Sequence, residues 1–472
     1  MGPGPGWDDR QRDLRRRLGS ATLAEMETGT VVVLPSATFP VAELSKITGI
    51  AFYEERMLFT TLFLARPEVR VVYLTSLPVD EAIVEYYLGF LADPAGARRR
   101  LTMVSLGEGD ARPLSHKLMA RPEVLAEVRT AAGGPDQAYV LPFNVTAAEQ
   151  AVSDALGLAV YGPHPDLARL GSKSGSRQVA RRAGVAVLAG AEDLASPADV
   201  DAAIESVRAE QPATTAVVVK LNEGFSGQGN AIVEVAGPHR TVTERPTTFC
   251  ATGETWASFA PKLVAGGGIV EELVRGTGVV SPSVQMRITP TGAVEVVSTH
   301  DQVLGGPENQ VYLGCRYPAK ERYRAAIEQA GLAVAGVLAA DGVIGSFGVD
   351  FVVRPASDGG PEVTLSEINL RMGGTTHPYW MARLASGGEG QPTAYVASDN
   401  LKSARLVGRR PAEVIAAVEE AGLGFDAASG TGTCLHLLGA LPEFGKMGVT
   451  CVGHSPADAQ RRYDEVVGFL VG

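Results

Sequence analysis

Short apolar runs alternate with amphipathic segments through the first third of the chain. The run at residues 30–34 (TVVVL) is rich in β-branched residues, as buried strands are, whereas residues 79–92 carry apolar side chains at helical spacing. Alternating strands and helices predict a parallel sheet that is flanked by helices. The expected strands are at residues 30–34, 70–76, 101–106, 138–143 and 158–161, and the expected helices are at 79–92 and 147–156.

The pattern changes after residue 165. The basic segment 174–183 is expected to form a helix that ends at Gly184, and Ser196-Pro197 is typical of a helix start with a capping serine and a proline in the first turn. From residue 268 onward, runs typical of strands predominate, which predicts an α+β unit. Strands are expected at residues 216–220, 231–235, 269–274, 284–289, 293–299, 347–353 and 363–369, and helices at 320–340, 411–421 and after Ser455.

The composition is that of an ordinary globular protein, with 45% hydrophobic and 20% charged residues. No apolar stretch approaches the roughly 20 residues that cross a bilayer. Because no signal-like apolar run follows the basic residues 10–17, we expect a cytoplasmic protein without a membrane partner. The net charge of −11 argues against a nucleic-acid partner. The four cysteines are scattered and the seven histidines lack metal-ligand spacing, so we expect buried thiols in a reducing compartment.

A glycine-rich loop joins two of the expected strands. It contains Gly224, Gly227 and Gly229 and follows Lys220, the last residue of the strand 216–220. Glycines let backbone amides approach phosphate oxygens, and the lysine adds a positive charge. A dinucleotide-binding or P-loop motif would continue into a helix, but a strand follows here. The loop is therefore either the flap of a hairpin that closes over phosphates or a plain hairpin turn with a solvated lysine.

A second lysine precedes the loop by one helix and one strand. The order Gly171-Ser172-Lys173 does not match the Gly-Lys-Ser/Thr order of a Walker motif, which we reject. Lys173 is then either a surface residue or a second phosphate-binding lysine that reaches the same ligand from another element.

The most specific local pattern lies in the expected hairpin 347–369. Glu367, Asn369 and Arg371 alternate, so they share one face of a strand, and hairpin pairing could place Asp350 opposite them. Two carboxylates and an amide oxygen are hard donors that suit Mg²⁺, and the arginine suits a phosphate or an oxyanion. The alternative is an exposed polar hairpin face with surface ion pairs.

Taken together, these motifs resemble the ATP-grasp superfamily. Lys173, Lys220 with its glycine loop, the strand 269–274, Asp350 and the sequence Glu367-Ile368-Asn369-Leu370-Arg371 occur in the order and approximate spacing of that family, over about residues 161–378. The resemblance implies a fold of mixed α/β and α+β character. Its expected parts are a pre-ATP-grasp β/α domain (1–165), a central lobe with the glycine flap (166–275), a lobe with the metal site (276–398) and a tail packed on the ligase core (399–472).

The resemblance also implies ligands for ATP and Mg²⁺. Glu271, Glu272 and Val274 match the hinge strand that holds adenine, while Asp350, Glu367 and Asn369 match the metal ligands. The last motif's Arg371 would act on the transferred phosphoryl group.

Two positions depart from the family pattern. Residues 275–278 offer no ribose-binding glutamate, and Gly348 stands where some relatives have an arginine two residues before the metal-binding aspartate. In place of that arginine, Arg287 on the strand 284–289 is our candidate for holding the acyl phosphate. A solvent-facing strand arginine is the alternative.

The resemblance implies an ATP-dependent ligase that forms an amide bond through an acyl phosphate. The chain further resembles the peptide ligases of secondary metabolism, in particular the pheganomycin type. Those join a nonproteinogenic guanidino amino acid to the amino end of a peptide, so acidic groups for the guanidinium are expected in the cleft. Three alternatives remain: another ATP-grasp amino-acid or carboxylase-type ligase, a phosphotransferase, and a non-catalytic nucleotide-binding subunit. The sequence predicts no oligomeric state.

Overall fold

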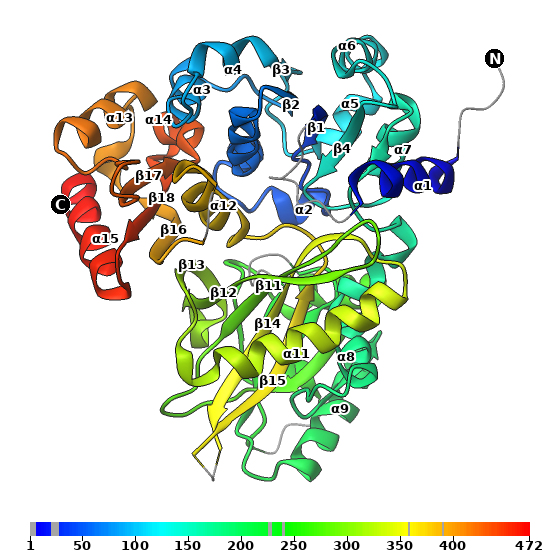
Figure 1. The fold of residues 1–472 in the computed structure, drawn as a ribbon. Helices are drawn as coiled ribbons and strands as arrows, with labels where there is room; N and C mark the ends of the chain where they lie inside the picture. The colour runs from blue at the N-terminus through cyan, green and yellow to red at the C-terminus, as the bar shows by residue number, and fades with distance from the viewer. Residues whose placement is uncertain (1–5, 20–27, 225–228, 238–240, 357–358, 389–390) are drawn as a thin grey trace.

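The chain folds around three β-sheets (Figure 1). A computed structural model describes residues 6–19, 28–224, 229–237, 241–356, 359–388 and 391–472. None of the helices that these residues form is long and apolar enough to cross a membrane.

The first sheet is parallel, as the alternating pattern predicts, with the strand order β3-β2-β1-β4-β5. Its central strand β1 is buried along most of its length, which explains its nearly continuous apolar sequence. The strands are β1 (Thr28–Leu34), β2 (Glu68–Thr75), β3 (Leu101–Ser105), β4 (Ala138–Pro142) and β5 (Ala159–Val160). The helices of this domain are α1 (Trp7–Leu18), α2 (Val41–Leu44), α3 (Glu81–Leu88), α4 (Pro94–Arg100), α5 (Leu114–Met119), α6 (Pro122–Ala132) and α7 (Ala147–Leu156).

A long 3-10 segment, η2 (Ile50–Ala65), connects β1 to β2 and packs against β2 and α12. No sequence pattern predicts it. Its apolar residues do not follow a helical or a strand period, and it buries two glutamates, Glu54 and Glu55, along with its apolar side chains. This segment carries Tyr53 and Arg56 to the edge of the site described below.

The second sheet has the order β6-β10-β7-β8-β9 and has a hydrophobic core of its own. Strands β7 and β8 pair antiparallel, so the glycine loop between them is the loop of a hairpin, as predicted. The strands are β6 (Gly190–Leu194), β7 (Ala216–Leu221), β8 (Asn230–Glu234), β9 (Thr247–Phe249) and β10 (Gly268–Glu272). The accompanying helices are α8 (Lys173–Arg182), α9 (Pro197–Glu210) and α10 (Trp256–Gly266).

The third sheet has eight strands in the order β15-β14-β11-β12-β13-β16-β18-β17. Helix α11 (Glu321–Ala340) packs against β11 and β12 (Figure 1). The strands are β11 (Pro282–Ile288), β12 (Val294–Gly305), β13 (Val311–Tyr317), β14 (Gly345–Pro355), β15 (Pro361–Asn369), β16 (Ala394–Lys402), β17 (Gly432–His436) and β18 (Lys446–Gly453). The remaining helices are α12 (Thr376–Ala385), α13 (Pro411–Glu420), α14 (Leu441–Phe444) and α15 (Pro456–Val471).

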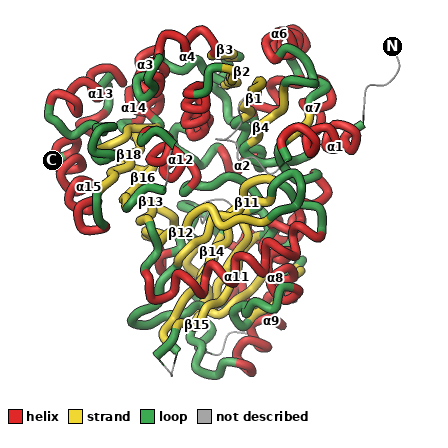
Figure 2. The backbone as a smooth tube through the Cα atoms, in the orientation of Figure 1, coloured by secondary structure: helices red, strands yellow, loops and turns green. Residues whose placement is uncertain are grey.

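The carboxyl-terminal part of the chain therefore extends the third sheet. Strand β16 pairs with β13 and continues through β18 to β17, and Figure 2 shows β16 and β18 beside α15 at the end of the molecule opposite α1. Our expected boundary between residues 398 and 399 falls inside β16. One hydrophobic core joins side chains of the first domain, the third sheet and these last strands, which holds the tail against the rest of the chain.

The junction between β13 and β16 depends on a glycine. A Cβ at Gly314 would lie 2.1 Å from the carbonyl oxygen of Ala397 on β16, so Gly314→Ala forces the paired strands apart. We expect it to lower the free energy of unfolding by roughly 1–3 kcal/mol in urea denaturation. Gly336→Ala is the matched control, because a Cβ at that exposed glycine of α11 would meet no atom within 4 Å. It should stabilise the protein by about 0.5–1 kcal/mol, and equal effects of the two changes would contradict this account.

Candidate active site

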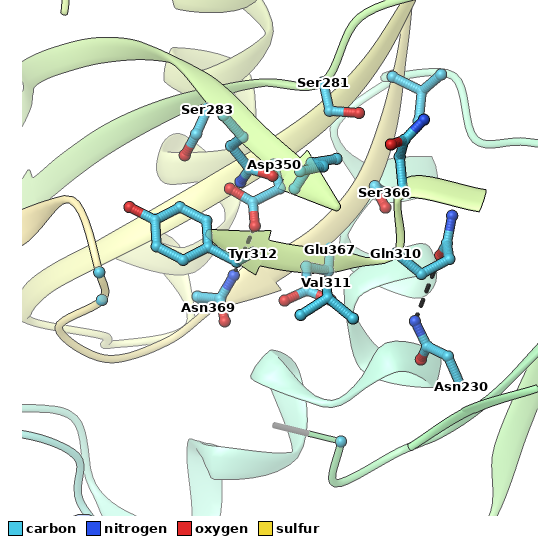
Figure 3. Close-up of a pocket in the computed structure, with 18 of the residues that line it drawn as sticks. Asn230, Ser281, Ser283, Gln310, Val311, Tyr312, Asp350, Ser366, Glu367 and Asn369 are labelled. Carbon is cyan, nitrogen blue, oxygen red and sulfur yellow. Dashed lines mark hydrogen bonds between the residues drawn. The ribbon is translucent and has the colours of Figure 1, made fainter. Parts of the chain in front are cut away.

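A cavity of about 1300 Å³ lies where the second and third sheets meet the first domain. Its lining comes from η2, from the hinge after β10, from the inner face of the third sheet and from the tail strands. Figure 3 shows part of this lining, with the polar side chains of β14 and β15 turned toward one another. A cavity of this size accommodates a nucleotide together with a further substrate.

The pairing of β14 with β15 brings the predicted metal ligands together. Asp350 stands directly opposite Glu367, and Gly348 opposite Asn369, so the hairpin register assumed from the sequence is confirmed. The side-chain amide of Asn369 donates a hydrogen bond to Asp350 Oδ2 at 2.9 Å (Figure 3). Ser283 on the neighbouring β11 is paired with Asp350 from the other side.

The two carboxylates influence each other's ionisation. Burial and then the charge of Glu367 raise the pKa of Asp350 to about 6, although hydrogen bonds from Ser283 and Gln302 work against this. Burial also works to raise the pKa of Glu367, but nearby cations, foremost Lys173, lower it to about 2. Two carboxylates in one site repel, so additional positive charge between them is favoured.

Both predicted phosphate-binding lysines line this cavity and are held by carboxylates. Lys173, the first residue of α8, forms an ion pair with Glu367. Lys220 near the end of β7 forms an ion pair with Glu271 on β10, and its ammonium lies 3.5 Å from Ser366 Oγ. The two lysines thus approach from different elements, as their sequence separation suggested, and each is oriented before any ligand binds.

The hinge strand ends at the cavity. The backbone N–H of Glu272 donates to the Ala189 carbonyl at 2.8 Å, and that of Leu273 donates to Ala216 at 3.1 Å. The chain then leaves the sheet, and Glu272 and Val274 line the cavity. The side chain of Glu271 is buried beside Lys220, so its carboxylate orients that lysine rather than lying free at the hinge.

The base of the glycine flap borders the cavity. Gly224 is part of the lining, and a Cβ at Gly229 would lie 3.0 Å from the Cα of Gly224, so the two ends of the loop approach closely. Gly227 lies outside the described residues. Just beyond the loop, Asn230 donates to Gln310 Oε1 at 3.4 Å (Figure 3), which connects the flap hairpin to the loop between β12 and β13.

The two predicted arginines have different positions. Arg371 lines the cavity, with its guanidinium 5.5 Å from the ring centre of Phe39 and 5.8 Å from that of Phe143. Arg287 does not line it. It is 1% exposed and its Nε donates to Glu295 Oε2 on β12 at 3.1 Å, because the antiparallel register places these two residues directly opposite. The structure therefore gives Arg287 a structural contact in place of the substrate contact that we expected.

Glycine at position 348 also has a local explanation. A Cβ there would lie 2.9 Å from the Nε2 atom of Gln285, which lines the cavity. The side chain of Gln285 on the adjacent strand β11 thus occupies the space that a larger side chain at position 348 would need.

Sequence reasoning missed one set of residues that line the cavity. Its side chains come from η2, from β13 and from the tail, and no short motif marks them. These residues are Tyr53, Arg56, Tyr312, Asp399, Asn400, Lys402 and Lys446. The rarity of lysine in an arginine-rich chain was the one available signal.

The side chains present suit Mg²⁺ and nucleotide phosphates. Two carboxylates and an amide make a set of oxygen donors for a hard cation, and lysines beside them provide point charges for phosphate oxygens. Within the described residues, no group of three or more His, Cys, Asp or Glu side chains is arranged to hold a metal. A cation at Asp350 and Glu367 would therefore share its remaining ligands with a substrate.

Two family models match parts of the chain. A model described as IQCH-like, ATP-grasp matches residues 247–372, the region that includes the hinge, Asp350 and Glu367. A model described as PGM1 C-terminal domain matches residues 413–466, within the tail.

Two relatives of the chain agree with the ATP-grasp match. The chain is 31% identical over 453 residues to L-propargylglycine–L-glutamate ligase of Streptantibioticus cattleyicolor, and the match covers 91% of each protein. A weaker match, 20% identical over 61% of this chain and 32% of the relative, is to IQ motif-containing protein H of Danio rerio.

Solved structures support the same fold. N5-carboxyaminoimidazole ribonucleotide synthetase in complex with ADP superposes with a TM-score of 0.55 at 12% identity, covering 93% of this chain and 97% of that one. Biotin carboxylase from Campylobacter jejuni superposes with a TM-score of 0.54 at 13% identity, covering 92% and 90%. With the ligase relative aligned over nearly its whole length, the chain belongs to the ATP-grasp superfamily of carboxylate–amine ligases.

Proposed function

We propose that this enzyme activates the carboxylate of a nonproteinogenic amino acid as an acyl phosphate and joins it to the amino end of a peptide. The observation that carries the proposal is the meeting of Asp350, Glu367 and Asn369 with Lys173 and Lys220 in one cavity. Amide formation from a free carboxylate is unfavourable in water, so cleavage of ATP must accompany it. Consumption of ATP is also consistent with our expectation of a cytoplasmic enzyme.

Asp350, Glu367 and Asn369 are the proposed Mg²⁺ ligands. The cation supplies positive charge that offsets the phosphates of ATP. Lys173 and Lys220 neutralise the phosphates that are not transferred, and Glu367 and Glu271 hold these two ammonium groups in place.

The proposed hinge contacts are made by the backbone. Strand β10 ends at Glu272. We assign the carbonyl group of Glu272 and the N–H of Val274 to the edge of adenine. Glu271 contributes indirectly, by orienting Lys220.

The reaction then has two steps. An oxygen of the substrate carboxylate attacks the γ-phosphorus. The bond between the γ-phosphorus and the oxygen of the β-phosphate breaks, which gives the acyl phosphate and ADP. The amine attacks the acyl carbon, inorganic phosphate leaves with its oxygen, and the amine loses a proton. Arg371, at the cavity wall, stabilises the negative charge on the transferred group. The loop with Gly224, Gly227 and Gly229 excludes water, which would otherwise hydrolyse the acyl phosphate.

A free amino acid is a second candidate for the amine substrate. The ligase relative's name contains two single amino acids, L-propargylglycine and L-glutamate, which supports a free amino acid as this second candidate. The two candidates are separated by mass spectrometry of reactions that contain ATP, MgCl₂, a panel of amino-acid carboxylates, and either single amino acids or short peptides. ADP without an amide product for any pair would contradict both.

Loss of one proposed metal ligand should abolish turnover without unfolding the protein. We expect Glu367→Gln to lower kcat/KM by roughly 10²–10³-fold. The substitution removes the negative charge that would bind Mg²⁺ and that pairs with Lys173. The ADP-release assay measures this, with thermal unfolding as a check on folding. Wild-type kinetics in this variant would disprove the metal site.

Removal of the metal should have the same result reversibly. Treatment with EDTA is expected to stop both ADP release and amide formation, and excess MgCl₂ should restore them, because the lysines alone do not offset the phosphate charge at this position. Turnover that persists in EDTA would rule out this use of Asp350 and Glu367.

The two arginines provide a matched pair of variants. Arg371→Met should lower kcat by at least tenfold with little change in stability, because it removes a charge from the cavity wall. Arg287→Met should leave kcat nearly unchanged and lower the free energy of unfolding by about 2 kcal/mol, because Glu295 loses its buried partner. Steady-state kinetics and urea denaturation distinguish the two, and the reverse pattern would restore Arg287 as the substrate-binding residue.

A further inference from the structure

Helix α8 lies between the two sheets that carry the proposed ATP-binding residues. It packs against β15 of the third sheet and against β6 and β10 of the second. Its first residue, Lys173, is paired with Glu367 on β15. Ser176 of the same helix accepts a hydrogen bond from the Ile368 N–H at 2.9 Å, which fixes the helix to β15. One helix therefore borders both sides of the site.

The same helix carries a second cation, Arg177, one turn after Lys173. This arginine does not line the cavity, and its side chain is 1% exposed. Its Nε donates to Glu192 Oε2 on β6 at 3.0 Å, and its Nη2 donates to the Leu188 carbonyl at 3.1 Å. A buried guanidinium is unfavourable unless nearby groups compensate its charge. These two contacts hold the guanidinium in one orientation against the second sheet.

The third nitrogen of Arg177 faces the carboxylate that orients Lys220. Arg177 Nη1 lies 3.8 Å from Glu271 Oε2, and within the described residues neither atom has a hydrogen-bond partner. The other carboxylate oxygen, Oε1, pairs with Lys220. Burial lowers the pKa of Arg177, and the charge of Glu271 is the largest influence that opposes this shift. The buried carboxylate of Glu271 is thus shared between a lysine in the cavity and an arginine behind it.

This sharing sets how much positive charge Lys220 presents to a phosphate. Lys220 and Glu271 alone would form a neutral pair, whereas Arg177 brings the net charge of the three groups to +1. Glu192 does not cancel that charge, because it is also paired with Arg181. Charges in a buried cluster are screened much less than charges at the surface. A guanidinium one group behind the cavity therefore still favours a bound anion.

We propose that Arg177 is a positioning residue for ATP: through Glu271 it holds the Lys220 ammonium toward the phosphates and keeps its positive charge effective there. The inference rests on the proposed function, which makes ATP the ligand of Lys220. Arg177 itself touches no substrate. Helix α8 then acts on both phosphate-binding lysines. It presents Lys173 at its first turn and supports Lys220 through Arg177 and Glu271.

Nucleotide binding tests the proposal without turnover. Isothermal titration calorimetry on the full chain compares adenosine, which has no phosphate, with β,γ-imido-ATP in the presence of MgCl₂. We expect Arg177→Met to weaken binding of the ATP analogue by roughly tenfold or more, as is typical of coupled charges. Adenosine affinity should stay nearly unchanged, because only phosphates meet Lys220. Arg177→Lys, which keeps the charge, should retain most of the analogue affinity.

A double variant isolates the role of charge. Arg177→Met/Glu271→Gln removes the arginine together with the negative charge that it balances, and the new amide oxygen can still accept from Lys220. We expect this variant to regain most of the analogue affinity that Arg177→Met loses. Arg182→Met is the matched control: it removes an exposed cation of the same helix, whose partner Asp341 lies outside the cavity, and it should bind the analogue like the wild type.

The outcomes separate this inference from the proposed function. If wild-type protein binds no ATP analogue, the proposed function fails and this inference fails with it. If the wild type binds the analogue and Arg177→Met binds it equally well, only the inference is overturned. Equal losses of adenosine and analogue affinity, or a double variant no better than Arg177→Met, would also overturn it. Thermal unfolding checks each variant, and Arg177→Gln, whose amide can still donate to the Leu188 carbonyl, takes the place of Arg177→Met if that variant does not fold.

Discussion

The architecture of the site depends on two carboxylates that face each other across one strand pair. The register of β14 with β15 sets Asp350 against Glu367, and their mutual repulsion is opposed by Lys173 from α8. One ammonium cannot balance both charges, which is reflected in the opposite pKa shifts of the pair. A divalent cation that also binds phosphate oxygens would resolve this electrostatic conflict. In the proposed function, the surrounding structure brings phosphates and a carboxylate to that cation.

Three separate parts of the chain enclose the cavity around this pair. The second sheet contributes Lys220, the hinge and the base of the flap, the first domain contributes Arg56 through η2, and the tail contributes Lys402 and Lys446. The tail can do so because β16 pairs with β13 and so joins the same sheet as β14 and β15, which carry the proposed metal ligands (Figure 1). The proposed metal ligands thus lie on β14 and β15, whereas the opposite part of the cavity lining comes from η2 and from the tail strands β16 and β18.

The sequence predicted those parts of the structure that follow from local pattern. The parallel sheet is indicated by its strand and helix alternation, and the alternation of Glu367 and Asn369 predicts their shared strand, although β15 ends before Arg371. Contacts set by register or by distant packing were not accessible. Arg287 has its partner in Glu295 only because β11 and β12 pair in one register. Lys402 and Lys446 become neighbours through the pairing of β16 with β18, and η2 has no period that would reveal it.

In the proposed reaction, one oxygen of the substrate carboxylate is transferred to phosphate. This transfer is tested most directly by running the reaction with a carboxylate substrate labelled with ¹⁸O at both oxygens and analysing the released phosphate by mass spectrometry. Attack on the γ-phosphorus followed by displacement by the amine predicts one ¹⁸O atom in each phosphate formed. Amide product accompanied by unlabelled phosphate would contradict an acyl-phosphate pathway in this cavity.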